Sequence, residues 1–374
     1  MPRTFYLVAG EHSGDTRGAE LMEALRERWP DCRFHGLGGP KMTALADGGV
    51  EDWVDEAAVV GLWEVLRKYS YFKARLEKAK RDVGQVDPDA LILVDYPGFN
   101  LRLARAVREA GAKARIVDYI SPQVWAWKKG RVFEMAHYLD LMCCLFPFEV
   151  DLFQQVGIRT VCIGHPLVQQ LEAVRIAGGR EEKLVGLFPG SREREVARLL
   201  PEMLAAAAAL RKEDPELRFV VAAASESLGA TIREMSRDHE GIEVQVGKAH
   251  ELMQRAMAGV VASGTATLEA SYYGLPHCLV YKVAWPTYLA GRMVVKIDFI
   301  GMANILAGKM IAPELIQHEA TADNITAFLE SVLGDEGRRE AMTRDLLAVA
   351  DQLGQGRAAE RGAEAIDKLL DESD

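Results

Sequence analysis

The sequence predicts an α/β protein with two doubly wound parallel sheets in two successive domains. Short β-branched runs that are apolar on both faces of a strand recur along the chain, as in strands buried inside a parallel sheet. Most of these runs end in Gly, Pro or a polar turn and are followed by a helical pattern, which is the order of βαβ units. The 374 residues also exceed one ordinary domain, so two domains are expected.

The first series of expected strands lies in the N-terminal half. A helix is expected after the first strand, from about Asp15, because Leu21, Leu25 and Trp29 repeat at the spacing of one helical face. We expect this domain to span residues 1–172. Its expected strands are residues 5–10, 32–39, 91–95, 114–120, 141–146 and 160–164.

The second series follows the charged, Gly-containing stretch Arg175 to Lys183, which we interpret as the linker. The second domain is expected at residues 173–354. The C-terminal segment 355–374 reads as a helix and is a candidate to cross back to the first domain. The expected strands of the second domain are residues 184–190, 217–225, 242–247, 259–264 and 276–283, with closing helical patterns at 321–334 and 337–353.

The composition narrows the class of protein. The chain has 45 basic and 55 acidic residues, a net charge of −10, which argues against a nucleic-acid protein held by its overall field. The five cysteines are odd in number and show no C-x-x-C spacing, so neither a disulfide framework nor a zinc site is expected. We expect no metal and no cofactor.

Targeting signals are not expected either. Residues 1–10 lack the apolar stretch and cleavage site of a signal peptide. The longest stretch without charge, Ala256 to Leu268, has 13 residues, fewer than the roughly 18 to 20 that span a bilayer. A cytoplasmic protein that does not span a membrane is expected.

Loops that follow strands are the candidate sites, because ligands of doubly wound sheets bind at the carboxyl ends of the strands. In the loop Gly10 to Asp15, two glycines allow close approach of a ligand, and Ser13 or Asp15 can cap the next helix. A merely structural turn has the same appearance. The loop His35 to Pro40, which contains Gly39, indicates either ligand approach or tight packing.

Two further loops of the first half contain candidate catalytic or binding residues. Asp95 ends a buried strand, where a carboxylate needs a partner or a task, so it is either a general base or an Asp that binds nearby backbone amides. The segment Ser121 to Arg131 joins two tryptophans, including Trp125, to three cations. It fits a nucleic-acid surface, a sugar or lipid site, or core tryptophans beside a solvated turn, and the acidic composition favours the sugar or lipid site.

The second half repeats this arrangement. Ser191 and Arg192 follow a strand and suit a diphosphate, unless they form a capped turn with a solvated Arg. Ser263, Gly264 and Thr265 form a similar turn, and Glu269, one turn later, either binds ribose hydroxyls or is an exposed helical Glu.

Histidines and paired aspartates are weaker candidates. His12 and His165 are candidates for acid–base work, although isolated histidines are more often structural. The D-x-D sequence at residues 87–89 precedes a strand and therefore lies at the wrong end of the sheet, so we interpret it as a turn.

Residues 59–80 form an amphipathic helical pattern. An apolar stripe, bordered by two aromatic residues, faces away from a basic face. Such a helix either lies in a membrane interface or packs on its own sheet with a solvated basic face. The stripe contains Val59, Leu62, Leu66, Tyr69 and Leu76, its borders are Trp63 and Phe72, and the basic face contains Arg67, Lys68, Arg75 and Lys78.

Together these motifs resemble the lipid-A-disaccharide synthase family. The residues that carry the resemblance occur in family order from residue 10 to residue 317, and the ordered set is highly specific. They are Gly10 to Asp15, Gly36 to Pro40 with Met42, Asp95 to Asn100, Ser121 to Arg131, Pro147 to Glu149, Gly164 to Pro166, Pro189 to Arg192, Ser263 to Glu269, Asn304, Pro313 to Leu315 and Gln317.

The resemblance implies a GT-B fold, with two Rossmann-like domains facing an interdomain cleft. It also implies an inverting reaction in which diacylglucosamine moves from UDP-2,3-diacylglucosamine to the 6-hydroxyl of 2,3-diacylglucosamine 1-phosphate, giving a β-1,6 disaccharide and UDP. Acylated substrates imply peripheral association with the cytoplasmic face of the inner membrane, with Leu62, Trp63, Leu66, Tyr69 and Phe72 as the contact residues.

The resemblance also implies roles for single residues. Asp95 is expected to be the general base, Arg192 to hold the UDP diphosphate in place of a metal, and Asn304 to be required for activity. The family has a small residue where this chain has His12, and many members have a second Asp where it has Gly98. Expected substrate-binding residues are Ser13, Gly14, Gly39, Ser191, Ser263, Gly264, Thr265, Glu269 and Gln317, with His12 and Trp125 as further candidates.

Two alternative functions stay open at this point. A UDP-N-acetylglucosamine 2-epimerase or related sugar-nucleotide enzyme would use the same frame without an acceptor. A non-catalytic protein that binds a sugar nucleotide or a lipid would not need Asp95 for its activity.

Overall fold

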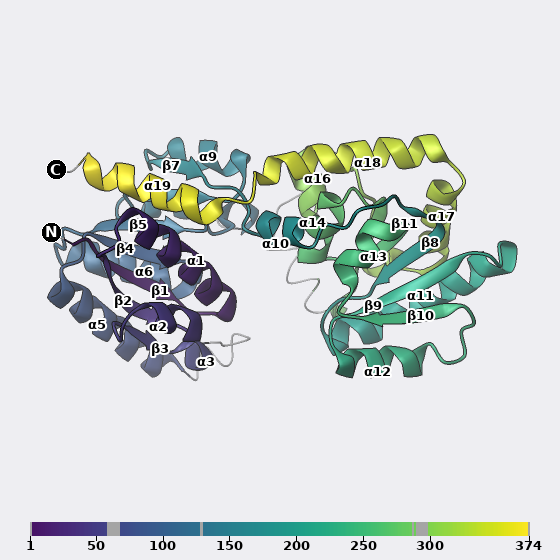
Figure 1. The fold of residues 1–374 in the computed structure, drawn as a ribbon, viewed down its shortest axis with the longest axis horizontal. Coiled ribbons are helices and arrows are strands. Elements are labelled where there is room, and N and C mark those ends of the chain that lie inside the picture. The colour runs from purple at the N-terminus through teal and green to yellow at the C-terminus, as the bar shows by residue number, and fades with distance from the viewer. Residues whose placement is uncertain (1, 58–67, 128–129, 286–287, 289–297, 373–374) are drawn as a thin grey trace. The chain divides into compact units, whose positions relative to one another are not determined.

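The computed structural model describes residues 2–57, 68–127, 130–285, 288 and 298–372 (Figure 1). The chain divides into two compact units, Met1–Pro166 with Gln355–Asp374, and Leu167–Gly354. Each unit is a parallel sheet with helices on both faces. The predicted fold class, two doubly wound α/β domains, is therefore confirmed.

The first unit has a seven-stranded parallel sheet in the order β3-β2-β1-β4-β5-β6-β7. The strands are β1 (Thr4–Ala9), β2 (Arg33–Gly38), β3 (Val50–Asp52), β4 (Ala90–Val94), β5 (Arg115–Tyr119), β6 (Leu141–Cys144) and β7 (Thr160–Cys162). The helices are α1 (His12–Arg28), α2 (Pro40–Leu45), α3 (Val54–Ala57), α5 (Tyr69–Val86), α6 (Pro97–Glu109), α7 (Val124–Trp127), α8 (Arg131–Met135), α9 (Pro147–Gln154) and α19 (Ala358–Asp371).

Two hydrophobic clusters cover the two faces of this sheet. Residues of α1 and α19 pack on one face, and residues of α5, α6 and α8 pack on the other (Figure 1). The last helix therefore belongs to the first unit. Arg28 donates to Asp367 at 2.6 Å, and Gly362 leaves room for the Tyr119 ring, which a Cβ at this position would approach to 2.7 Å.

The second unit has a six-stranded parallel sheet in the order β10-β9-β8-β11-β12-β13. The strands are β8 (Glu181–Phe188), β9 (Arg218–Ala223), β10 (Ile242–Val246), β11 (Ala256–Ala262), β12 (His277–Tyr281) and β13 (Glu314–Ile316). The helices are α10 (Leu167–Ala173), α11 (Glu193–Glu213), α12 (Glu226–Met235), α13 (Ala249–Arg255), α14 (Thr265–Tyr272), α16 (Met302–Ala307), α17 (Ala322–Leu333) and α18 (Glu336–Ala350), with 3-10 turns at Gln317–Glu319 and Asp351–Leu353.

All of the expected strands are present, and two strands were missed. β3 and β13 have three residues each and lie at the edges of their sheets, so neither shows a run long enough to be recognised from sequence. Hydrogen bonding to their neighbours, β2 and β12, holds these residues in extended conformation.

The predicted linker is wrong in its second half, because β8 already begins at Glu181. The preceding residue, Arg180, donates to the carbonyl oxygens of Met253 at 2.9 Å, Ala256 at 2.6 Å and Tyr273 at 2.6 Å. These carbonyls lie at the ends of α13 and α14. Arg180 therefore ties α13 to α14, the helix that carries the candidate site residues Thr265 and Glu269.

The boundary between the units falls before α10 and not after residue 172. α10 packs on α14, where the Tyr273 hydroxyl donates to the Leu171 carbonyl at 3.1 Å and the Tyr272 hydroxyl donates to Glu172. Contacts of this kind, between residues a hundred positions apart, carry no local sequence signal.

Arg180→Leu is expected to lower the free energy of unfolding by about 3 kcal/mol, because several partly buried carbonyls lose their donor. Urea unfolding of the variant and of wild type measures this difference. Arg344→Leu, at an exposed position of α18, is the matched control and should change stability little. Equal losses in the two variants would contradict the role of Arg180.

Candidate active site

The edge of the first sheet where β1 and β4 end is the candidate catalytic region. These strands are neighbours, but the sheet continues to β2 on one side and to β5 on the other, so the loops after them diverge. Ligands of doubly wound sheets bind at this kind of switch point. Register pairs Ala9 with Val94, so Glu11 and Asp95 follow at adjacent strand ends.

Asp95 is half-buried in a turn of unusual backbone. Asp95 and Tyr96 have φ values of 49° and 54°, the left-handed region that non-glycine residues rarely adopt. The Asp95 amide donates to the Tyr119 carbonyl at 3.1 Å, and the Asp95 carboxylate accepts from the Tyr96 amide at 2.9 Å. Strain of this kind persists only where the surroundings enforce it, and it gathers at functional sites.

The Tyr96 side chain is what enforces this turn. Its hydroxyl donates to the Ala57 carbonyl at 2.9 Å, and its ring lies 6.1 Å from Trp53 and 6.5 Å from Phe99. A Cβ on Gly10 would lie 2.2 Å from the same ring. Gly10 is therefore required for packing of the Tyr96 ring.

Three carboxyl groups interact electrostatically at this edge. Burial raises the pKa of Asp95 above its usual value, and the single backbone donor opposes this only in part. Burial also raises the pKa of Glu11, with a further contribution from Asp95. Asp118 on β5 is fully buried, and its pKa is raised well above the ordinary range by burial and then by Asp95.

Glu11 and Asp118 interact with Asp95 and were not among the predicted site residues. Glu11 lay within a recognised loop but received no role. Asp118 was absorbed into an expected strand, although a carboxylate inside an otherwise apolar run is a signal of its own.

Asp15 is structural rather than catalytic. Its carboxylate accepts from the amides of Gly39 at 2.8 Å, Lys41 at 3.0 Å and Met42 at 3.0 Å at the start of α2. A Cβ on Gly39 would lie 2.7 Å from the Asp15 side chain, so tight packing explains this glycine. A role of Gly39 in substrate binding stays a prediction.

Ser13 and Gly14 open α1 at the same edge. Ser13 is exposed, and a Cβ on Gly14 would make only ordinary contacts, the nearest at 3.4 Å. Packing therefore does not explain why residue 14 is a glycine.

The two candidate histidines lie in different environments. The exposed His12 ring lies 3.0 Å from the exposed carboxylate of Asp55. His165 is packed against Phe146 with ring centroids 5.6 Å apart, and burial, followed by the charge of Arg17, lowers its pKa to about 4. His165 is therefore neutral at physiological pH.

Glu149 organises the loop after β5. Its buried carboxylate accepts from the Ser121 hydroxyl at 2.8 Å and from the Trp125 indole at 3.0 Å, and two backbone amides also donate to it. Burial nevertheless raises the pKa of Glu149. Trp125 is thus fixed in orientation with its ring half-buried, while Lys128 and Lys129 lie outside the described residues.

In the second sheet the switch point lies between β8 and β11. Ser191 and Arg192 follow β8, and the Arg192 side chain is 81% exposed. Glu195 accepts from the Arg192 guanidinium at 2.9 Å and from the Ser191 amide at 3.2 Å. A carboxylate of the chain itself therefore occupies the two donors that were predicted to bind a diphosphate.

The turn after β11 contains Ser263, Gly264 and Thr265. Gly264 has φ 144° and a Cβ there would meet nothing within 4 Å, so its backbone conformation, not packing, requires glycine. Glu269 is only 17% exposed, and one of its oxygens lies 3.2 Å from His250 Nε2. The alternative in which Glu269 is an exposed helical residue is therefore wrong.

Asn304 and Gln317 form hydrogen bonds with backbone groups of neighbouring segments. The buried Asn304 donates to the Ala312 carbonyl and to Glu314, and accepts from the amides of Ile311 and Ala312, all within 2.7–2.9 Å. Gln317 accepts from the Val283 amide at 2.7 Å and donates to its carbonyl at 3.1 Å. These bonds account for both residues without a ligand.

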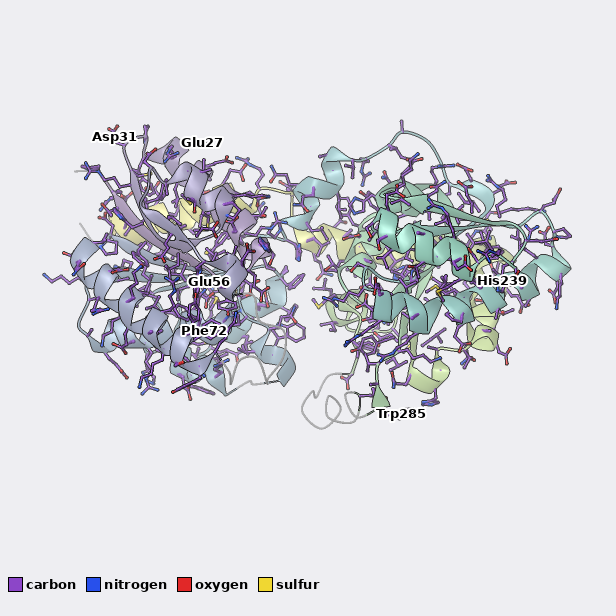
Figure 2. All side chains as sticks on the ribbon, turned by 90° about the horizontal axis from the view of Figure 1, so that it is seen from below. Glu27, Asp31, Glu56, Phe72, His239 and Trp285 are labelled. Carbon is purple, nitrogen blue, oxygen red and sulfur yellow. The ribbon has the colours of Figure 1, made fainter. Side chains whose placement is uncertain are left out.

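The predicted amphipathic segment is described only in part, and Leu62, Trp63 and Leu66 lie outside the described residues. Tyr69, the first residue of α5, is 60% exposed. Phe72, labelled in Figure 2, is half-buried. Its ring makes an edge contact with the Trp53 ring, with centroids 6.5 Å apart.

Two cations of this helix, Arg75 and Lys78, are paired with carboxylates of the same unit. Arg75 pairs with Glu51 and, at 3.3 Å, with Glu56, and Lys78 also pairs with Glu51. Ion pairs with carboxylates therefore form part of this basic face, and neither alternative for the segment is excluded. No helix in the described parts of the chain is both long and apolar enough to cross a membrane.

Comparison of the sequence with known proteins shows the family to which the chain is similar. The chain matches the model of the lipid-A-disaccharide synthetase family over residues 5–367. It is 40% identical over 380 residues to the lipid-A-disaccharide synthase of Syntrophus aciditrophicus (strain SB), an alignment that covers 98% of each protein.

Two solved structures share the fold. A putative UDP-N-acetylglucosamine 2-epimerase from Listeria monocytogenes has a TM-score of 0.63 at 14% identity, covering 100% of this chain and 98% of that chain. The calicheamicin glycosyltransferase CalG4 has a TM-score of 0.55 at 15% identity, covering 99% and 98%. Epimerases and glycosyltransferases of the GT-B type thus have this arrangement of two parallel-sheet domains in common.

Asp118→Asn is expected to stabilise the protein at neutral pH. The raised pKa of Asp118 means that the folded state keeps its proton at pH values where the unfolded chain, with an ordinary pKa of about 3.9, has lost it. Stability therefore falls as pH rises between these two pKa values, and the amide removes this contribution.

Melting temperatures of Asp118→Asn and wild type, compared from about pH 4 to about pH 8, test this. The difference should grow with pH, and each ~1 kcal/mol should appear as roughly 2–4 °C. Asp31→Asn, at an exposed position, should show no such trend. A variant less stable than wild type at the upper pH would contradict the argument.

Proposed function

The chain belongs to the lipid-A-disaccharide synthase family, which are glycosyltransferases of lipid A biosynthesis, and we propose that Asp95 is the general base of the transfer. The family reaction moves diacylglucosamine from a UDP donor to the 6-hydroxyl of an acylated glucosamine 1-phosphate. The observation that carries the assignment is a half-buried carboxylate in a strained turn at the switch point, with one backbone donor and a raised pKa.

The proposed step is a single in-line displacement. The proton of the acceptor 6-hydroxyl passes to the Asp95 carboxylate while the 6-hydroxyl oxygen forms a bond to the anomeric carbon of the donor. The bond from that carbon to the diphosphate oxygen breaks, and its electron pair leaves with UDP. Inversion converts the α-linked donor into a β-linked product.

A base with a raised pKa suits this chemistry. The ionised form of such a carboxylate accepts a proton more readily than an ordinary aspartate, and a positioned general base contributes roughly 10²- to 10⁴-fold to the rate. His12 is a weaker candidate, because its ring is exposed and lies against Asp55.

We assign the UDP moiety to the second unit. Arg192 and the Ser191 amide would hold the diphosphate, and the exposed Arg192 guanidinium can exchange its Glu195 partner for this anion. The turn at Ser263 to Thr265 would contact phosphate, and Glu269 would accept from the ribose hydroxyls. Asn304 and Gln317 act as positioning residues, through the backbone that they brace.

The epimerase hypothesis rests on fold alone. Similarity at 14% identity does not transfer an activity, whereas the synthase relative is 40% identical over nearly the whole chain. An epimerase would also consume the UDP-sugar in the absence of an acceptor.

Asp95→Asn is expected to lower turnover by roughly 10²- to 10⁴-fold while UDP affinity stays unchanged. UDP release from the diacylated donor, with and without the acylated glucosamine 1-phosphate, measures turnover. Wild-type kcat/KM should rise with pH through a pKa above the ordinary value of about 3.9.

The exposed substitution Asp31→Asn is the control and should retain full activity. Turnover that survives in Asp95→Asn would exclude Asp95 as the base. Failure of the wild-type protein to form a disaccharide with donors of any acyl length would contradict the proposed reaction.

We further propose that the start of α5 contacts a membrane surface at the cytoplasmic face. Both substrates of the family reaction carry acyl chains, and the exposed Tyr69 ring offers an amphipathic contact of the kind found at lipid interfaces. Arg75 and Lys78 are already paired with Glu51, so these two cations should add little attraction to anionic lipid.

Tyr69→Ser is expected to weaken binding to phosphatidylglycerol-containing vesicles several-fold in a sedimentation assay. Wild-type binding should depend little on salt, because apolar burial rather than charge supplies most of the attraction. Phe133→Ser, at a similarly exposed aromatic residue of α8, is the control. Equal loss in both variants, or a steep salt dependence, would contradict the assignment to α5.

A further inference from the structure

The contact between His250 and Glu269 has no role in any expectation drawn from the sequence. His250 is the second residue of α13, which follows β10, and Glu269 lies in α14, which follows β11. Both side chains therefore come from helices that begin at the carboxyl edge of the sheet. His250 Nε2 lies 3.2 Å from Glu269 Oε2.

The two side chains are partly buried, and the His250 ring packs against a neighbouring aromatic ring. Glu269 is 17% exposed and His250 is 36% exposed, so each keeps an accessible part. The His250 ring packs against the Tyr273 ring with centroids 6.1 Å apart, and the Tyr273 hydroxyl is itself fixed on the Leu171 carbonyl. A ring held in this way presents Nε2 in one direction.

The backbones that carry the pair are also tied together. Arg180 donates to carbonyls at the C-terminal ends of both α13 and α14. These hydrogen bonds hold the backbones of α13 and α14 together, and this helps to fix the distance between His250 and Glu269.

The hydrogen bond has a consequence for recognition. It engages Oε2 of Glu269, and among the described residues no hydrogen bond reaches Oε1. A carboxylate binds a vicinal diol well only when the plane of the carboxylate is fixed, because its oxygens must be positioned to accept hydrogen bonds from the two hydroxyls. The hydrogen bond to Glu269 also raises the pKa of His250, which is consistent with an attractive contact.

We propose that His250 is a positioning residue that fixes the Glu269 carboxylate for the ribose hydroxyls of the UDP donor. This inference rests on the proposed function, in which Glu269 receives the ribose. His250 acts through Glu269 and not on the reacting atoms, so it affects donor binding and leaves the chemical step unchanged.

His250→Ala is expected to raise the donor KM and the UDP Kd by roughly 10-fold, the size of one hydrogen bond to a charged group, while kcat stays within about 2-fold of wild type. His250→Gln, whose amide can donate from a similar position, should restore most of the affinity. His239→Ala, in the turn after α12 at the opposite edge of the sheet, is the control.

A deoxy nucleotide separates positioning from a general defect. In wild type, UDP should bind more tightly than 2′,3′-dideoxy-UDP, and His250→Ala should weaken only UDP. In a double-mutant cycle, His250→Ala should have no further effect once Glu269→Ala is present. Equal weakening of both nucleotides, or additive effects of the two substitutions, would overturn the inference.

The same measurements distinguish this inference from the proposed function. A wild-type protein that does not bind UDP would contradict the donor assignment itself. Glu269→Ala with unchanged UDP affinity would remove Glu269 from the ribose site and His250 with it. Loss of affinity in Glu269→Ala but not in His250→Ala would overturn the positioning role alone.

Discussion

Parallel strand pairing is the constraint on which the rest of this structure depends. In both sheets every strand pair is parallel, so the carboxyl ends of all strands in a unit meet at one edge. The neighbouring strands β1 and β4, and likewise β8 and β11, lead into loops that diverge. Residues from distant parts of the chain, such as Glu11 and Asp95, become neighbours for this reason alone.

The buried and half-buried carboxylates differ in how many hydrogen-bond donors surround them. Asp15 accepts from three backbone amides, and Glu149 accepts from two side chains and two amides. Asp95 accepts from one amide, and burial raises its pKa against this single opposing hydrogen bond. Burial raises the pKa of Glu149 as well, but four donors engage the Glu149 carboxylate and fix its loop, whereas the Asp95 carboxylate has a single backbone donor.

In the second unit, polar side chains mostly act on the backbone and on each other. Asn304 and Gln317 brace the segments around β13, and Arg180 joins α13 to α14. Glu195 accepts from the Ser191 amide and from the Arg192 guanidinium, so under the proposed function a diphosphate would replace this carboxylate.

The sequence by itself determined the strand order along the chain, the parallel class of both sheets and the loops that end the strands, because buried βα units have a local periodic signature. Asp95, Arg192 and Glu269 were predicted from these loops, and their roles stay predictions. Only the tertiary structure decided the edge strands β3 and β13, the packing role of Gly39, the pairing of Arg75 with Glu51, and the contact between His250 and Glu269. Each of these depends on residues far apart in sequence, and local periodicity carries no information about which distant residue becomes a neighbour.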